Sequence, residues 1–176
     1  MKIIAYGSKY GTAKEYAEEL SGRTGVEAVA YGDVGDINSY DEIIYFGPLY
    51  AGSVLGLKKT LSKVVNASEK KIIISTVGLA DPNDEKNRQR IVERIKKQLP
   101  SDVFDNLKIH FLRGAIDYSR LSRKHRAMMA VAYRRAKGLD EEEMTAEIRA
   151  VVETYGRKVS FMDFDSLNPI VDEMMD

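Results

Sequence analysis

The sequence predicts an α/β fold: a doubly wound sheet of five parallel strands, covered by helices on both faces, with a helical insertion near the fifth strand. Short apolar runs of strand length alternate with helical patterns through the first 112 residues. The connections are short, as expected where helices link neighbouring parallel strands. Residues 113–157 break this rhythm and predict the insertion. We expect residues 1–176 to form a single domain.

The first half of the chain predicts three strands and two helices. Strands are expected at Lys2–Tyr6, Val26–Tyr31 and Glu42–Phe46, the last ended by Gly47-Pro48. From Thr12 the apolar residues follow a helical period, namely Ala13, Tyr16, Ala17 and Leu20. Ser53 is expected to cap a second helix. Its predicted apolar face is Val54, Leu57, Leu61, Val64 and Val65.

The second half predicts two more strands, Lys71–Val77 and Leu107–Leu112. Asp81-Pro82 is expected to start the helix between them. Its buried face is predicted to be Ile91, Val92, Ile95 and Leu99. In the insertion we expect a basic helix over about 119–136 and an acidic helix over about 140–155. A strand-like run, Lys158–Met162, and a short helix over 166–175, with Pro169 in its first turn, complete the chain.

Composition excludes several kinds of site. The chain has no cysteine, so disulfides, thiolate metal sites and cysteine nucleophiles are excluded, and a reducing, cytoplasmic location is expected. Its two histidines, His110 and His125, lie far apart in the sequence, and no metal site is expected. The apolar run at Met1–Gly7 is too short for a signal peptide, and no run approaches the ~18 apolar residues of a membrane span.

Charge is unevenly distributed. The whole chain balances 27 basic against 27 acidic residues, yet residues 113–137 hold eight basic residues and one acidic residue, a net of +7. This segment predicts an anionic partner, either a small substrate or a membrane surface, and not a nucleic acid, because aromatic residues are too sparse. The alternative is a solvated helix paired with the acidic helix at 140–153. His125 lies among Arg123, Lys124 and Arg126, and we expect it to be solvated.

Three loops follow the carboxyl ends of predicted strands, where ligands bind in such sheets. They are residues 7–12, 47–53 and 78–82. The first loop offers hydroxyl groups and the amino end of a helix to a phosphate. The alternative is that it is a plain strand-to-helix turn. The second offers Tyr50 to a planar ligand, or uses it to cover the sheet end. In the third, Gly78 permits close backbone approach, and Asp81 is expected to be a cap. No nucleoside-triphosphate or dinucleotide glycine motif is present.

Together these loops resemble those of the flavodoxin-like family, which binds FMN. Ser8-Lys9-Tyr10-Gly11-Thr12-Ala13 is similar to its phosphate loop, and Pro48-Leu49-Tyr50-Ala51-Gly52 resembles a loop motif of its flavodoxin-domain branch. Leu112–Tyr118 resembles a further signature of that branch, which includes quinone-dependent protoporphyrinogen oxidases.

The resemblance implies a role for each loop. Residues implied to hold the FMN phosphate are Ser8, Lys9, Tyr10, Gly11, Thr12 and Ala13. Those implied to line the isoalloxazine ring are Pro48, Leu49, Tyr50, Ala51 and Gly52, with Thr76, Val77, Gly78 and Leu79 at its other edge. Ala13 stands where many relatives place threonine, which predicts weaker phosphate binding.

The leading hypothesis is an FMN-dependent oxidoreductase that transfers electrons or hydride, with a quinone or porphyrinogen-type substrate. The alternative is a flavodoxin-type electron-transfer protein without its own substrate, and a third hypothesis is a flavin-free interaction protein on the same scaffold. The redox partner is not specified by the sequence, and no catalytic acid or base is identified near the loops.

Overall fold

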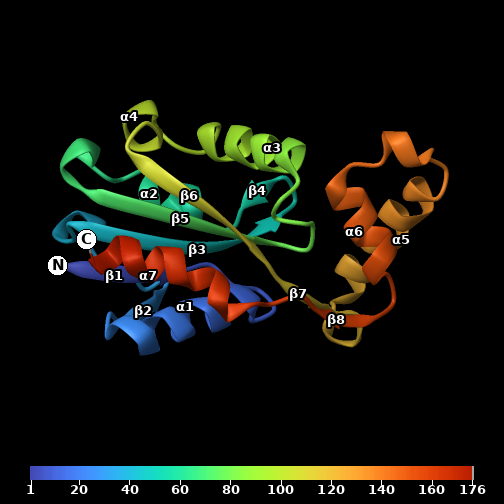
Figure 1. Cartoon of the computed structure of the whole chain (residues 1–176), viewed down its shortest axis with the longest axis horizontal. Coiled ribbons are helices and arrows are strands. Elements are labelled where there is room, and N and C mark those ends of the chain that lie inside the picture. The colour runs from blue at the N-terminus through green and yellow to red at the C-terminus, as the bar shows by residue number, and fades with distance from the viewer. Residues whose placement is uncertain (176) are drawn as a thin grey trace.

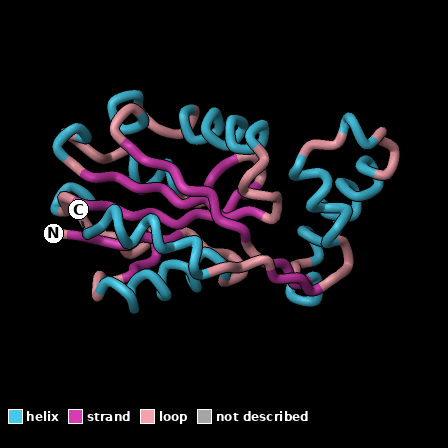
Figure 2. The backbone as a smooth tube through the Cα atoms, viewed as in Figure 1, coloured by secondary structure: helices cyan, strands magenta, loops and turns pink. Residues whose placement is uncertain are grey.

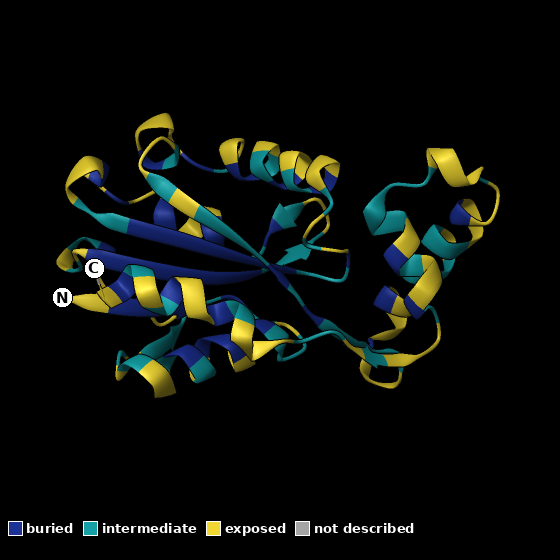
Figure 3. Ribbon diagram, in the orientation of Figure 1, coloured by how far each residue is buried: buried dark blue, intermediate teal, exposed yellow. Residues whose placement is uncertain are grey.

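The computed structural model describes residues 1–175, and its centre is a parallel sheet with the strand order β2-β1-β3-β5-β6 (Figure 1). The strands are β1 (Lys2–Tyr6), β2 (Ala28–Ala30), β3 (Glu42–Tyr50), β5 (Lys71–Gly78) and β6 (Leu107–Arg113). Isoleucines of the central strands are buried on both faces of the sheet, as parallel strands between two helical layers require (Figure 3). The predicted fold class is confirmed.

Helices cover the two faces of the sheet (Figure 2). On one face lie α1 (Thr12–Thr24) and α7 (Asn168–Met175), whose Leu20 and Ile170 belong to the same buried cluster as Ile44 and Ile73. On the other face lie α2 (Leu57–Leu61), α3 (Glu85–Lys96) and α4 (Ser101–Phe104), which pack against Ile43, Ile72 and Ile74. Because successive strand residues point to opposite faces, adjacent isoleucines serve different layers.

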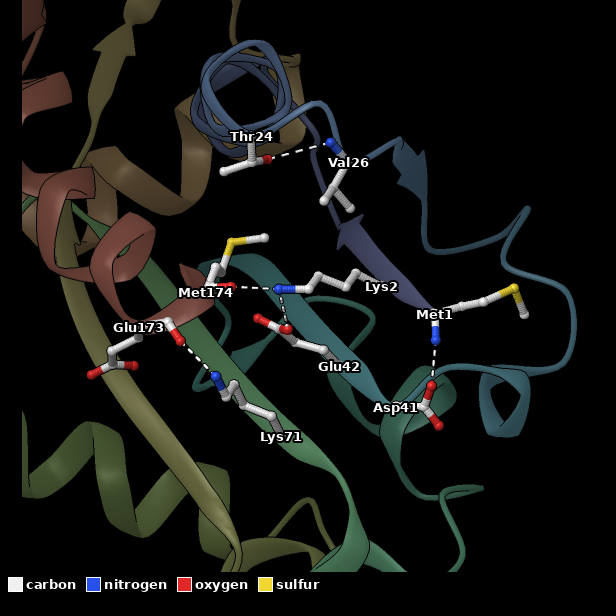
Figure 4. Close-up of polar contacts among 9 residues, drawn as sticks. All are labelled: Met1, Lys2, Thr24, Val26, Asp41, Glu42, Lys71, Glu173 and Met174. Carbon is white, nitrogen blue, oxygen red and sulfur yellow. Dashed lines mark hydrogen bonds and ion pairs between the residues drawn. The ribbon is translucent and has the colours of Figure 1, made fainter. Parts of the chain in front are cut away.

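The carboxyl end of α7 is held by side chains at the amino ends of the strands (Figure 4). Lys2 donates to the carbonyl of Met174 and pairs with the buried Glu42 carboxylate at 2.7 Å. Lys71 donates to the carbonyl of Glu173 at 2.6 Å. Lysines at this position satisfy terminal carbonyls and oppose the negative end of the helix dipole. Helix α7 therefore does not cover the carboxyl ends of the strands, where the loops lie.

Strand β3 continues past the predicted stop at Gly47-Pro48. It runs to Tyr50 and then folds back as a hairpin with β4 (Ser53–Val54). The carbonyl of Phe46 accepts from Gly7, and that of Pro48 accepts from Leu55, so both residues face the side where β1 ends at Tyr6. On that side Pro48 only accepts a hydrogen bond, so its lack of an N–H group is tolerated in the strand.

Two predicted helix starts were wrong. Ser53 lies in β4, and α2 starts four residues later after Gly56. Of its predicted apolar face, Val65 is exposed. Asp81 accepts from the backbone N–H of Asn83 in a turn, whereas Asp84 caps α3 by accepting from Asn87. Aspartates at both positions suit a cap, and sequence alone does not choose between them. The second strand is shorter than predicted, since it pairs with β1 over three residues.

The insertion is carried on a two-stranded antiparallel ribbon, β7 (Ala115–Asp117) and β8 (Lys158–Ser160). Its helices, α5 (Arg123–Ala136) and α6 (Ala146–Thr154), lie beyond the end of the sheet (Figure 1). Both are shorter than predicted because Ser122 and Thr145 cap them by accepting from backbone N–H groups at 3.3 and 3.2 Å. The remaining short elements are 3-10 turns at Ile37–Ser39, Ala67–Glu69, Tyr118–Arg120, Glu141–Glu143 and Phe164–Leu167.

The close packing of β3 against β4 yields a stability prediction. A Cβ atom at Gly47 would lie 2.4 Å from Val54 Cγ1 and 2.9 Å from Tyr45 Cε1. We expect Gly47→Ala to lower the free energy of unfolding by about 1–3 kcal/mol, as overpacking does. Gly22, inside α1, has no neighbour within 4 Å of such an atom, and Gly22→Ala should raise the free energy by about 0.5–1 kcal/mol. Urea denaturation measures the free energy of unfolding of both variants. Equal changes in the two variants would contradict the close packing around Gly47.

Candidate functional site

A cavity of about 280 Å³ opens at the carboxyl ends of β1, β3 and β5. The chain leaves β1 toward one face of the sheet, where α1 lies, and leaves β3 toward the other, where α2 lies. This divergence opens a crevice between the two loops, the position at which doubly wound sheets bind ligands. The cavity is therefore a product of the strand order.

The loop after β1 presents the amino end of α1 to the cavity. Gly11 precedes the helix with φ of 102°, a left-handed conformation that glycine adopts without strain. Its N–H donates to Ser8 Oγ at 3.1 Å. No side chain in residues 1–175 caps α1, whose first backbone bond is donated by Glu15 to the Gly11 carbonyl. The N–H groups of Thr12, Ala13 and Lys14 are thus available to an anion, which the helix dipole also favours.

The two other loops supply apolar walls. Pro48, Leu49, Tyr50 and Ala51 come from the end of β3 and its turn, and Val77, Gly78 and Leu79 come from the end of β5. Ala51 has φ of 47°, a conformation unusual for alanine that holds the tight turn. The arrangement is an apolar slot with an anion-binding end, which is the chemistry that a planar aromatic phosphate ester requires.

Of the fifteen residues predicted for the site, twelve line the cavity. Gly11 and Gly52 do not line it but shape the two loops with positive φ values. Thr76 is buried within the sheet, where its hydroxyl donates to the His110 carbonyl at 3.4 Å. Lys9 does line the cavity, but its ammonium lies 4.8 Å from the centre of the Tyr50 ring.

One wall of the cavity comes from the insertion and was not predicted from the sequence. Gly114, Ala115, Ile116 and Asp117 line the cavity from β7 and its approach, and Leu121, His125, Met128 and Met129 line it from α5 and its approach. Leu121, His125, Met128 and Met129 are spaced as one face of a helix, and this spacing was the available signal.

His125 is buried, and the expectation that it is solvated was wrong. Its Nδ1 is hydrogen-bonded to the Tyr10 hydroxyl and its Nε2 to the Tyr50 hydroxyl. Burial lowers the pKa of His125, and Lys9 and Lys124 lower it further. The imidazole is therefore neutral at pH 7, with one ring nitrogen accepting from a tyrosine and the other donating to a tyrosine.

The cations of α5 are not paired with the acidic residues of the insertion. Within residues 1–175, no ion pair joins α5 to a carboxylate, although α6 lies beside it. The contacts between α5 and α6 include the stacked rings of Tyr133 and Tyr155, whose centres lie 4.0 Å apart. Arg126 is held by the carbonyls of Leu121 and Ser119, at 3.1 and 3.0 Å, and is not a free cation.

The described residues contain no cluster of three or more metal-binding side chains. Among the same residues, no helix combines the length and the hydropathy that crossing a bilayer requires.

Comparison with known structures returns flavoproteins of low sequence identity. A flavodoxin mutant of Fusobacterium nucleatum bound to flavin mononucleotide is 13% identical, covering 66% of this chain and 77% of its own, with a TM-score of 0.42. A flavoprotein of Lactobacillus acidophilus in complex with FMN is 13% identical, covering 64% and 91%, with a TM-score of 0.39. Oxidised flavodoxin 1 of Bacillus cereus is 14% identical, covering 67% and 87%, with a TM-score of 0.38.

Comparison with curated protein sequences finds no significant match. A family model, by contrast, matches most of the chain. The model describes the flavodoxin domain and matches residues 3–143, which include helix α5 and the five strands of the parallel sheet except the first residue of β1. The chain belongs to the flavodoxin domain family.

Proposed function

We propose that the protein is an FMN-dependent flavoprotein that transfers electrons or hydride at the cavity. The observation that carries this is the uncapped amino end of α1 beside an apolar slot, at the point where the sheet's connections diverge. Membership of the flavodoxin domain family supports the same cofactor.

The residues present fit FMN. Ser8, Thr12 and the backbone N–H groups at the start of α1 would hold the phosphate. The nearest acidic side chain is that of Glu15, in the first turn of α1, and it does not line the cavity. Pro48, Leu49, Val77 and Leu79 would enclose the ring, and Tyr50 offers an aromatic edge. When bound, FMN supplies one- or two-electron redox chemistry, and the chain's own residues bind it, orient it and exclude water.

The positive charge of α5 is better explained by an oxidoreductase with a small anionic substrate than by an electron carrier that docks on basic redox proteins. We define the basic surface as Arg123, Lys124, Arg134 and Arg135, four exposed cations of α5 that have no carboxylate partner within residues 1–175. Met128 lies beside Lys124 and Arg135 and lines the cavity. Positive charge at a cavity mouth raises the association rate of anions. Quinone and porphyrinogen-type substrates, and the branch that uses them, remain predictions from the loop motifs.

Charge at residue 11 tests the phosphate site. We expect Gly11→Asp to abolish FMN binding, because a carboxylate at the amino end of α1 repels the phosphate. Gly11→Asn is the matched control, since it has nearly the same shape and the same backbone strain without the charge. FMN titration of the apoprotein, followed by flavin fluorescence, measures both affinities. Equal affinities of the two variants would place the phosphate elsewhere.

The basic surface is tested by neutralising Arg123, Lys124 and Arg135 together with glutamine. With the FMN-loaded protein kept reduced under light with EDTA as the electron donor, we expect KM for an anionic acceptor, ferricyanide, to rise roughly three- to tenfold at low salt, and the effect to shrink as salt screens the charges. KM for a neutral acceptor, menadione, and the FMN affinity should not change.

The control replaces Lys58, Lys59 and Lys63, exposed cations that do not line the cavity. Equal effects of the two triple variants would contradict a local role of the basic surface. Loss of binding to anionic vesicles, with KM for ferricyanide unchanged, would assign the surface to a membrane instead.

A further inference from the structure

The inner face of α5 forms a wall of the cavity that the parallel sheet does not provide. Leu121 and His125 are buried there, and Met128 and Met129 complete the lining. With this wall in place the cavity is about 280 Å³, close to the lower end of the ~300–1,000 Å³ typical of ligand sites. A ligand held under α5 is covered on that side, so movement of α5 would widen its route to solvent.

Few contacts hold the insertion to the rest of the domain. Arg94 of α3 forms a bidentate pair with Glu147 of α6, at 2.5 and 2.9 Å. Arg113 lies 3.6 Å from Glu153, also on α6. Both ion pairs involve α6, so neither of them fixes the position of α5.

His125 makes those contacts for α5. Its two ring nitrogens are bonded to Tyr10, in the loop after β1, and to Tyr50, in the loop after β3. Both rings meet the imidazole edge-on, with centres 5.5 and 5.2 Å away. The Tyr10 hydroxyl also accepts from the N–H of Ser122, the residue that caps α5, at 3.4 Å. One imidazole therefore joins α5 to both loops of the candidate site.

The chemistry of the contact is specific. A neutral imidazole needs one donor and one acceptor, and a tyrosine hydroxyl serves as either. Buried ring nitrogens without partners would carry a desolvation penalty, so α5 is held most firmly when both hydroxyls are in place. An apolar side chain of similar volume would fill the space but leave the hydroxyls without their partner.

We propose that α5 is the third wall of the cofactor site and that His125, by bonding Tyr10 and Tyr50, is the positioning residue that keeps this wall closed over bound FMN. The proposal rests on the proposed function for the identity of the ligand, but the closure of α5 is a property of the protein alone. His125 controls how fast the cofactor leaves and does not take part in its redox chemistry.

The test compares His125→Leu, which keeps volume and removes both bonds, with His125→Gln, whose amide both donates and accepts. We expect hydrogen exchange of the α5 amides in the apoprotein to be about tenfold faster in His125→Leu, the effect of losing hydrogen bonds of ordinary strength. The FMN dissociation rate should rise by a similar factor. His125→Gln should restore most of both properties.

Tyr50→Phe and Tyr40→Phe form a second comparison. Tyr50→Phe removes one of the two bonds, whereas Tyr40 precedes β3 at the opposite end of the sheet and should have no effect. Unchanged α5 exchange in His125→Leu would overturn the closure. Faster exchange with unchanged FMN dissociation would overturn the link to the cofactor. If the wild-type protein binds no FMN, the proposed function fails, while the exchange measurement still decides whether His125 holds α5.

Discussion

The strand order of the sheet is the constraint on which the site depends. Because β1 lies between β2 and β3, the connection after β1 goes to one face and the connection after β3 goes to the other. The loops diverge and leave a cavity lined by residues of both loops, among them Ser8 and Tyr50. The amino end of α1 points into this crevice because α1 must start where β1 ends. An anion-binding group and an apolar slot are thereby brought together by topology.

The insertion changes what this crevice can do. An open crevice at a sheet edge suits a ligand that meets large partners, whereas here α5 lines one side of the cavity and carries Lys124 and Arg135 beside the lining residue Met128. The helix pair is joined to the domain by a two-stranded ribbon and by the Arg94–Glu147 pair, which is partly exposed and of modest strength. These features are the basis on which we propose a small anionic substrate in place of a docked protein.

Local patterns predicted the elements well and the long-range contacts poorly. The isoleucine-rich strands and the Ala13–Leu20 face of α1 follow from periodicity, and the meeting of three loops follows from parallel topology. The continuation of β3 through Pro48 depends on where β1 ends, which no local pattern contains. The burial of His125 depends on Tyr10, 115 residues away in the chain, so its charged neighbours gave a misleading indication of solvation.

The absorption spectrum and cofactor content of the protein, freshly purified and after incubation with FMN, test the central claim most directly. We expect a yellow protein that releases FMN on denaturation, about one molecule per chain, with the spectrum of the bound flavin distinct from that of free FMN. A folded protein that is colourless and takes up no FMN would contradict it.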